Sequence, residues 1–251
     1  MIRIGTAGWG IHARYADLFP AAGTHLARYA AVMNAVEINS SFYRPHRRVT
    51  YERWAASTPD DFRFAVKVPK AATHESRLKD TAAILDRLFD EVTGLGDKLG
   101  PLLVQLPPSL AFDAPVAAAF FSDLRARHAG HIACEPRHAS WFTPEADALL
   151  AERRVARVAA DPPAGAPAAA TPGGWPGLVY LRLHGTPRVY YSDYDDAALA
   201  AIADNLSVRA GPAEAWCIFD NTAGFAALGN ALSLKDRLAA HDDRLIQHDR
   251  G

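Results

Sequence analysis

The feature that most constrains the fold is a regular alternation of short apolar runs with helical segments along 251 residues. Eight runs have the length and the β-branched or aromatic content of strands. These strands are predicted at residues 2–9, 34–39, 62–68, 102–106, 131–135, 155–161, 178–184 and 215–220. Alternation of this kind is typical of a parallel sheet covered by helices.

Helices are predicted between the strands at residues 24–33, 49–57, 78–92, 115–128, 144–153, 195–207 and 225–238. Residues 162–177, after the sixth strand, are rich in Pro, Ala and Gly and are predicted to form a long loop, a candidate lid. Eight such units in about 250 residues favour a closed (β/α)8 sheet, like a TIM barrel, over an open one. We therefore predict one α/β domain over residues 1–251, with a closed parallel sheet and outer helices.

Composition excludes several classes of function. The formal net charge is -1 and Lys and Arg form no long run, which disfavours nucleic acid as a partner. No apolar run approaches the roughly 20 residues of a membrane span, and Met1 leads directly into a strand. We therefore expect a cytoplasmic protein without membrane contact. Cys134 and Cys217 lie in apolar runs and are predicted to be buried free thiols.

Alternation within the strands predicts which side chains face the interior of the sheet. If the apolar set faces the helices, the ionisable side chains that face inward are Arg3, Glu37, Arg63, Lys67, Glu135, Arg182 and His184. Burial of an unpaired charge costs several kcal/mol, so these groups must pair, meet water or meet a ligand. Pairing of Glu37 with Lys67, and of Glu135 with Arg182, is the structural alternative to a site. In the last strand, either Asp220 or Asn221 faces inward.

Seven motifs together resemble the DUF72 (YecE-like) family. They are Gly5–Trp9, Val36–Arg44, Phe64–Val68 with His74, Leu99–Ser109, Glu135–Phe142, Tyr180–Gly185 and Phe219–Thr222. They follow one another along nearly the whole chain. The resemblance implies a fold similar to TIM barrels and leaves the biochemical function unassigned. Ala7 stands where the family usually has serine, and Asp220 stands where it usually has asparagine, so no hydroxyl is available at position 7.

Polar side chains at the carboxyl ends of the strands form the candidate site, because loops at that end build the active sites of α/β barrels. The candidates for acid/base chemistry are Glu37, Glu135, Lys67 and His184. The candidates for substrate binding are Trp9, Asn39, Tyr43, Arg44, His74, Gln105, Arg137, His138, Trp141, Arg182, Tyr194 and Asn221. The basic groups suit a carboxylate or phosphate, and the aromatic groups suit a sugar or base.

We therefore predict an enzyme that acts on a small anionic or sugar-like molecule, and three alternatives stay open. The first is a metal-dependent isomerase or endonuclease, in which a divalent metal is held by Glu37, Glu135, Asp161, His184 and Asp220. No metal-binding spacing supports it, Lys67 and Arg182 would repel a cation, and no cofactor is predicted. The second is Schiff-base chemistry at Lys67. The third is a protein that binds a small molecule without catalysis.

Overall fold

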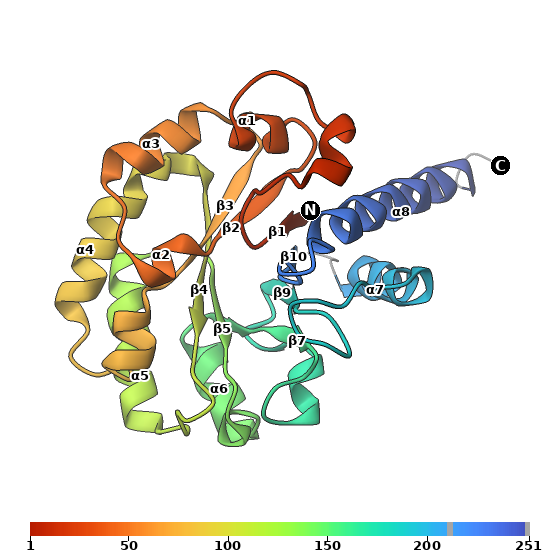
Figure 1. The fold of residues 1–251 in the computed structure, drawn as a ribbon. Coiled ribbons are helices and arrows are strands. Elements are labelled where there is room, and N and C mark those ends of the chain that lie inside the picture. The colour runs from red at the N-terminus through yellow and green to blue at the C-terminus, as the bar shows by residue number, and fades with distance from the viewer. Residues whose placement is uncertain (210–212, 249–251) are drawn as a thin grey trace.

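The computed structural model describes residues 1–209 and 213–248, with the side chains of all of these except Arg209 and residues 241–248. The strands are β1 Ile2–Thr6, β2 Ala35–Ile38, β3 Arg63–Lys67, β4 Leu99–Gln105, β5 Ile132–Glu135, β6 Val155–Arg157, β7 Ala159–Asp161, β8 Gly173–Gly174, β9 Leu178–Leu183 and β10 Glu214–Phe219. The α-helices are α1 His25–Ala30, α2 Ser40–Tyr43, α3 Arg48–Ala56, α4 Ala82–Val92, α5 Ala114–Arg127, α6 Pro144–Glu152, α7 Asp196–Arg209 and α8 Ala227–His248. The strands lie inside and the longer helices outside (Figure 1).

The strands form two sheets, in the orders β1-β10-β9-β7 and β2-β3-β4-β5-β6-β8. All pairs are parallel except β6 with β8, so the predicted parallel α/β fold is confirmed. The strand pairs do not form the single closed sheet that we predicted. Within the described residues, β1 and β2 are joined by an isolated bridge between Ala7 and Glu37 rather than by a ladder.

The second interruption is in the predicted sixth strand, which is divided at Val158 into β6 and β7. The Val158 amide donates to the Cys134 carbonyl at 2.8 Å, while β7 pairs with β9 in the other sheet. The free edge of β6 is occupied by β8, a strand of the Pro/Ala/Gly-rich loop, through Arg157 opposite Gly173. The loop therefore takes the hydrogen bonds that would join β6 to β9.

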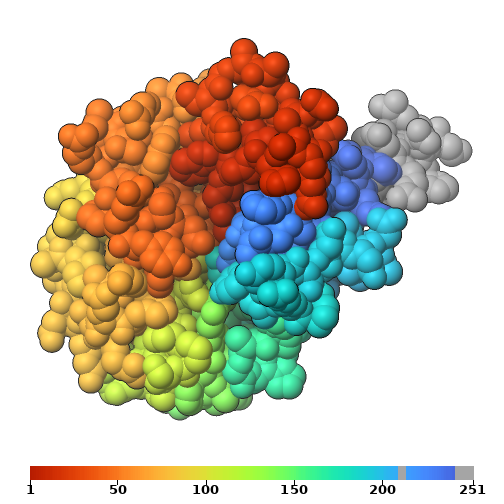
Figure 2. Space-filling model, in the orientation of Figure 1, coloured from red at the N-terminus to blue at the C-terminus, as the bar shows by residue number. Residues whose placement is uncertain are grey.

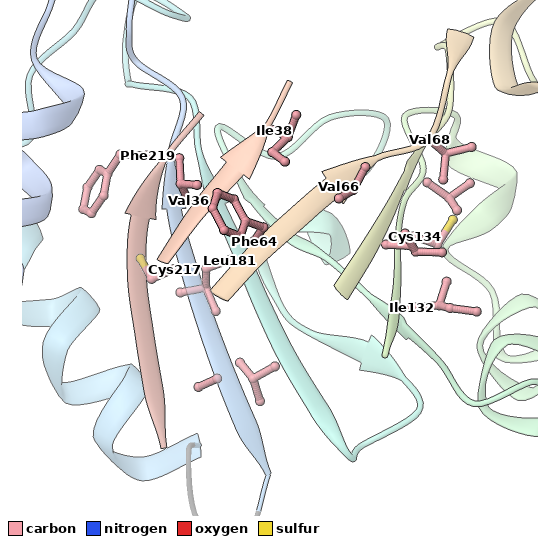
Figure 3. Packing of buried hydrophobic residues seen from close by; sticks show 14 of the residues in the cluster. Val36, Ile38, Phe64, Val66, Val68, Ile132, Cys134, Leu181, Cys217 and Phe219 are labelled. Atoms are coloured by element: carbon pink, nitrogen blue, oxygen red, sulfur yellow. The ribbon is translucent and has the colours of Figure 1, made fainter. Parts of the chain in front are cut away.

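The predicted alternation of side chains is confirmed. The apolar set between the sheets and the helices forms one buried cluster, part of which is drawn in Figure 3, including Val36, Ile38, Phe64, Val66, Ile132, Cys134, Leu181 and Phe219. The opposite faces of the strands form a second cluster of alanines and larger aliphatic residues, with Tyr180 and Trp216 as its aromatic members. Their rings stack with an interplanar angle of 3°. This packing fills the interior below the polar ends of the strands.

The long loop after β7 is confirmed as a segment without an α-helix, and it is anchored to the body of the protein. It contains a 3-10 helix at Pro167–Ala170 and the short strand β8. Arg157 donates to the carbonyls of Ala168 at 2.9 Å and Thr171 at 3.2 Å, and to Asp147 on α6 at 2.7 Å. One buried guanidinium therefore ties the loop to a helix.

Cys134 and Cys217 are buried free thiols, as predicted. Among the helices that the structure describes, none combines the length and the apolar character needed to cross a bilayer.

Candidate functional site

The candidate site lies at the carboxyl ends of the strands, the end that faces the viewer in Figure 2. There α2 and the segments after β9 and β10, coloured orange, cyan and blue, gather on one face (Figure 2). Five strands, and the residue directly after β10, contribute a buried polar side chain at this end: Glu37, Lys67, Gln105, Glu135, Arg182 and Asp220. His184 comes directly after β9, two residues beyond Arg182. The predicted gathering of charged groups is therefore observed, and it is buried.

Arg182 lies at the centre of the carboxylates and is 0% exposed. Its Nε and Nη2 atoms donate to the two Glu37 oxygens at 3.0 and 2.7 Å. Its Nη1 donates to Glu135 at 2.6 Å, and its Nη2 also reaches Asp220 at 3.0 Å. Burial opposes the charge of Arg182, but the three carboxylates outweigh it and raise its pKa well above the ordinary value.

The two predicted ion pairs have different outcomes. Glu135 pairs with Arg182 as expected, but Glu37 is paired with Arg182 instead of Lys67 and accepts a hydrogen bond from Tyr180 at 2.9 Å. The physical reason is the shape of the cation. A guanidinium presents two parallel N–H groups to one carboxylate, which an ammonium group cannot do.

His184 joins two of the carboxylates. Its Nδ1 lies 3.2 Å from Asp220, so Asp220 is the residue of the last strand that faces inward, and its Nε2 lies 3.1 Å from Glu135. Burial would lower the pKa of His184, but Glu135 and Asp220 raise it above the ordinary value. Burial would raise the pKa of Glu135, yet Arg182 and His184 hold it well below the usual range. His184 is therefore favoured as a cation and Glu135 as an anion.

Lys67 and Gln105 differ from these groups because they are buried without a hydrogen-bonding partner. Lys67 is 5% exposed and Gln105 is 7% exposed. In the part of the chain that the structure describes, neither side chain forms a hydrogen bond or an ion pair, and the Lys67 ammonium lies 4.2 Å above the Phe42 ring. Asn39 goes further, since its Oδ1 is fully buried and has no described partner. The carboxylates of the site are therefore paired, whereas Lys67 and Gln105 have no described hydrogen bond and their polar atoms are not among the fully buried ones that lack a partner.

Further basic groups surround Lys67. Arg137 donates to Glu135 at 3.0 Å, and Glu135 and Tyr190 outweigh burial to raise its pKa. Burial and then the charges of Lys67 and Arg137 lower the pKa of His74, which contacts Phe42 edge-to-face. Sequence reasoning missed Phe42 and Tyr190. Phe42 lies in a motif that we identified, but only packing shows which aromatic ring meets Lys67.

The remaining predicted residues make their described contacts outside the charged cluster. Trp141 is buried and donates to the Leu110 carbonyl at 2.9 Å, and His138 lies 2.8 Å from the Ser140 hydroxyl. Trp9 packs on Trp54, and Tyr43 and Arg44 are exposed. Tyr194 forms a hydrogen bond to Asp161, and Asn221 forms hydrogen bonds to Ser192 and Asn230.

The five residues of the metal alternative do not converge on one point. Asp161 accepts hydrogen bonds from Tyr194 at 2.6 Å and Thr186 at 2.9 Å and takes no part in the cluster. Glu37, Glu135 and Asp220 surround the Arg182 guanidinium, which takes the place that a metal would need. No group of three or more His, Cys, Asp or Glu side chains in the described residues has a geometry that could hold a metal ion.

Fold and site define an α/β protein with a buried, largely paired charge cluster at the carboxyl ends of its parallel strands. The sequence adds the family. A family described as "Protein of unknown function DUF72" matches residues 3–250, so the chain belongs to the DUF72 family and the predicted resemblance is confirmed.

Two curated relatives agree with this assignment. The chain is 30% identical to the UPF0759 protein YunF of Bacillus subtilis over 152 residues. This aligned stretch covers 57% of this chain and 53% of YunF. It is 31% identical to YecE of Escherichia coli K12 over 107 residues. This aligned stretch covers 43% of this chain and 38% of YecE. The aligned stretches thus span about half of YunF and less of YecE.

Two crystal structures of DUF72 family proteins share the fold. The protein from Enterococcus faecalis V583 has a TM-score of 0.80 at 22% identity, covering 95% of this chain and 96% of that one. The protein from Thermotoga maritima MSB8 has a TM-score of 0.78 at 24% identity, covering 95% and 99%. At this identity the likeness concerns the fold alone.

Proposed function

We propose that this protein is an enzyme that acts on a small anionic, sugar-like molecule bound at Lys67 and Gln105. The observation that carries the proposal is the burial of these two polar groups without a described partner. The nearby Asn39 has a fully buried Oδ1 without a partner among the described residues, and a buried polar group left unsatisfied costs about 1–3 kcal/mol. A ligand hydroxyl that donates to Asn39 would remove that cost, and oxygen acceptors on the same ligand would form charge-assisted hydrogen bonds with Lys67.

The charge of the site supports an anion. Lys67, Arg137, Arg182 and His184 outnumber the three carboxylates Glu37, Glu135 and Asp220 by one positive charge. The carboxylates are already bonded to Arg182, His184 or Arg137, so the excess charge belongs to Lys67. A carboxylate or phosphate at this position would gain charge-assisted hydrogen bonds in a region of low dielectric.

The acid/base chemistry is assigned to Lys67, with His74 as its neighbour. Burial, and then the charge of Arg182, lower the pKa of Lys67 to about 8, so it exchanges protons near neutral pH. Glu135 and His184 are assigned a structural role, because Arg182 holds Glu135 and Asp220 holds His184 through hydrogen bonds. Glu37, which is 0% exposed and fixed by two Arg182 bonds, holds Arg182 in place.

A binding experiment with inorganic phosphate, followed by small sugar phosphates and sugar acids, tests the proposal. We expect phosphate to raise the thermal midpoint of the wild type, and Lys67→Met to weaken binding at least tenfold. Lys70→Met is the matched control, because Lys70 is an exposed neighbour paired with Glu75 at 3.1 Å. Equal phosphate affinity of the wild type and Lys67→Met would contradict the site.

Turnover is tested separately by following each ligand that binds by NMR in the presence of the protein. Enzyme function predicts a slow change of at least one bound ligand, with loss of that change in Gln105→Leu or His74→Leu at saturating ligand. If every bound ligand stays unchanged with the wild type, the protein is a binding protein and the catalytic part of the proposal fails.

A further inference from the structure

We infer that Lys67 attacks a carbonyl group of the bound molecule and forms an imine with it, so that the substrate is an anionic aldehyde or ketone. The inference rests on the proposed function, because it uses the same site, and it adds the reactive group of the substrate.

The surroundings leave the Lys67 amine available for reaction. The acceptor groups nearest in the cluster, Glu37, Glu135 and Asp220, are bonded to Arg182 and His184. Lys67 has instead the Phe42 ring below it at 4.2 Å, and it is 5% exposed. A purely structural lysine would be expected to reach one of three carboxylates in the same interior, whereas a nucleophile must keep its lone pair free.

The protonation state of Lys67 also favours its role as a nucleophile. With the pKa of Lys67 lowered to about 8, roughly a tenth of the amine is neutral at pH 7, compared with well under one part in a thousand for an ordinary lysine. Burial is the first cause and the neighbouring Arg182 charge is the second. Desolvation and a nearby cation are the two devices by which proteins activate a lysine as a nucleophile.

The step balances with the groups present. The neutral Lys67 nitrogen forms a bond to the carbonyl carbon, and the C=O electron pair moves to the oxygen, which takes up a proton. The nitrogen loses a proton, and the hydroxyl leaves as water once it is protonated again. In sum, an ammonium group and a carbonyl give a protonated imine and one water, without oxidant or reductant. We assign the proton transfers to His74, whose pKa is lowered by burial and by the charges of Lys67 and Arg137, and we assign the anionic end of the substrate to Arg137.

The other lysines of the chain provide internal controls. Lys70 is paired with Glu75, Lys98 donates to the carbonyls of Ala55 and Thr58, and Lys235 donates to the carbonyl of Val32. Lys79 is exposed. Imine formation that depends on the site would select Lys67 over all four, whereas simple accessibility would select Lys79 and Lys70.

The test is reductive trapping with wild-type protein at pH 8 in an amine-free buffer. The protein is mixed with pyruvate or with dihydroxyacetone phosphate, reduced with sodium borohydride, and mapped by peptide mass spectrometry. We expect one adduct, located at Lys67, formed at least tenfold faster than at Lys70 or Lys79 and slowed by inorganic phosphate. Lys67→Arg, which keeps a cation in place, removes that adduct.

An adduct spread over the exposed lysines, or no adduct with either probe, would overturn the inference. If phosphate still raises the thermal midpoint of the wild type and no Lys67 adduct forms, the inference fails and the anion site stands. If phosphate has no effect and Lys67 is not labelled, both fail. Mapping on the wild type makes the result independent of whether a variant folds.

Discussion

At the scale of single residues, the site depends on the contrast between Arg182 and Lys67. The planar guanidinium of Arg182 bonds three carboxylates at once and makes their burial tolerable. Lys67, on the neighbouring side, has no oxygen partner among the described residues. Loss of Arg182 should therefore lower the free energy of unfolding, while loss of Lys67 should raise it.

Replacement of Arg182 by Met should lower the free energy of unfolding by about 3–5 kcal/mol, because it leaves buried carboxylates without their main partner. Urea unfolding at pH 7 measures the change. The matched control, Tyr180→Phe, removes only the hydrogen bond to Glu37 and should cost about 1–2 kcal/mol. The difference in free energy of unfolding between Arg182→Met and the wild type should become smaller toward pH 4.5, because the unpaired carboxylates of the variant take up protons. A loss below 1 kcal/mol would show that the cluster does not depend on Arg182.

The pH dependence of Lys67 follows from its lowered pKa. Between about pH 8 and the ordinary value of 10.5 the unfolded chain holds more protons at this group than the folded chain. The contribution of Lys67 to the free energy of unfolding therefore rises with pH in that window. In Lys67→Met this rise is absent, so the stability difference between variant and wild type should change by roughly 3 kcal/mol from pH 7 to 10.5. Urea unfolding in phosphate-free buffers measures it, and a constant difference would contradict the lowered pKa.

At the scale of elements, the carboxyl ends of the strands collect the polar groups, and one interruption shapes the sheets. The helix expected in most β–α units is absent after β7, and a loop takes its place. This loop supplies β8 to the edge of β6 and is fixed by Arg157. The lid that we predicted for residues 162–177 is therefore tied down on one side.

Replacement of Arg157 by Met should release this loop without unfolding the sheets. The amides of Ala169 and Thr171, which form local hydrogen bonds in the anchored loop, should exchange with deuterium at least tenfold faster. Arg153→Met, close by on the same segment, is the control and should leave these amides unchanged. Exchange rates that stay equal to the wild type would show that the loop holds its structure without Arg157.

At the scale of the whole molecule, two sheets meet where β1 passes β2. Gly5 lies there with its backbone against that of Ala35, and a Cβ atom at position 5 would overlap the Ala35 carbonyl oxygen. A glycine is therefore required by the close approach of two strands. The bridge between Ala7 and Glu37 lies just beyond this contact and leads into the charged cluster.

Replacement of Gly5 by Ala should separate these strands and lower the free energy of unfolding by about 3 kcal/mol. Gly10→Ala is the matched control. No atom lies within 4 Å of a Cβ placed there, so its effect should stay within about 0.5 kcal/mol. Thermal and urea unfolding of the two variants measure the difference. Equal stability would mean that the two sheets are not in close contact at this point.

Much of the fold and part of the site followed from local pattern. The period of two within strands is a local property, so it correctly sent Glu37, Glu135, Arg182 and His184 to the interior. The short helix α2 escaped prediction, because its four residues lie in a polar loop with no helical period. The division of the sixth strand also escaped, because it depends on β8, a distant segment of two glycines.

The sequence by itself determined which side chains enter the interior and at which end of the strands they lie, because both depend on alternation along a single strand. Only the tertiary structure decided which of them pair. Glu37 and Arg182 come from strands in different sheets, and their bidentate contact depends on how those sheets approach. Among the described residues, that contact leaves Lys67 and Gln105 without a hydrogen-bonding partner, because the three carboxylates of the cluster are already bonded to other groups.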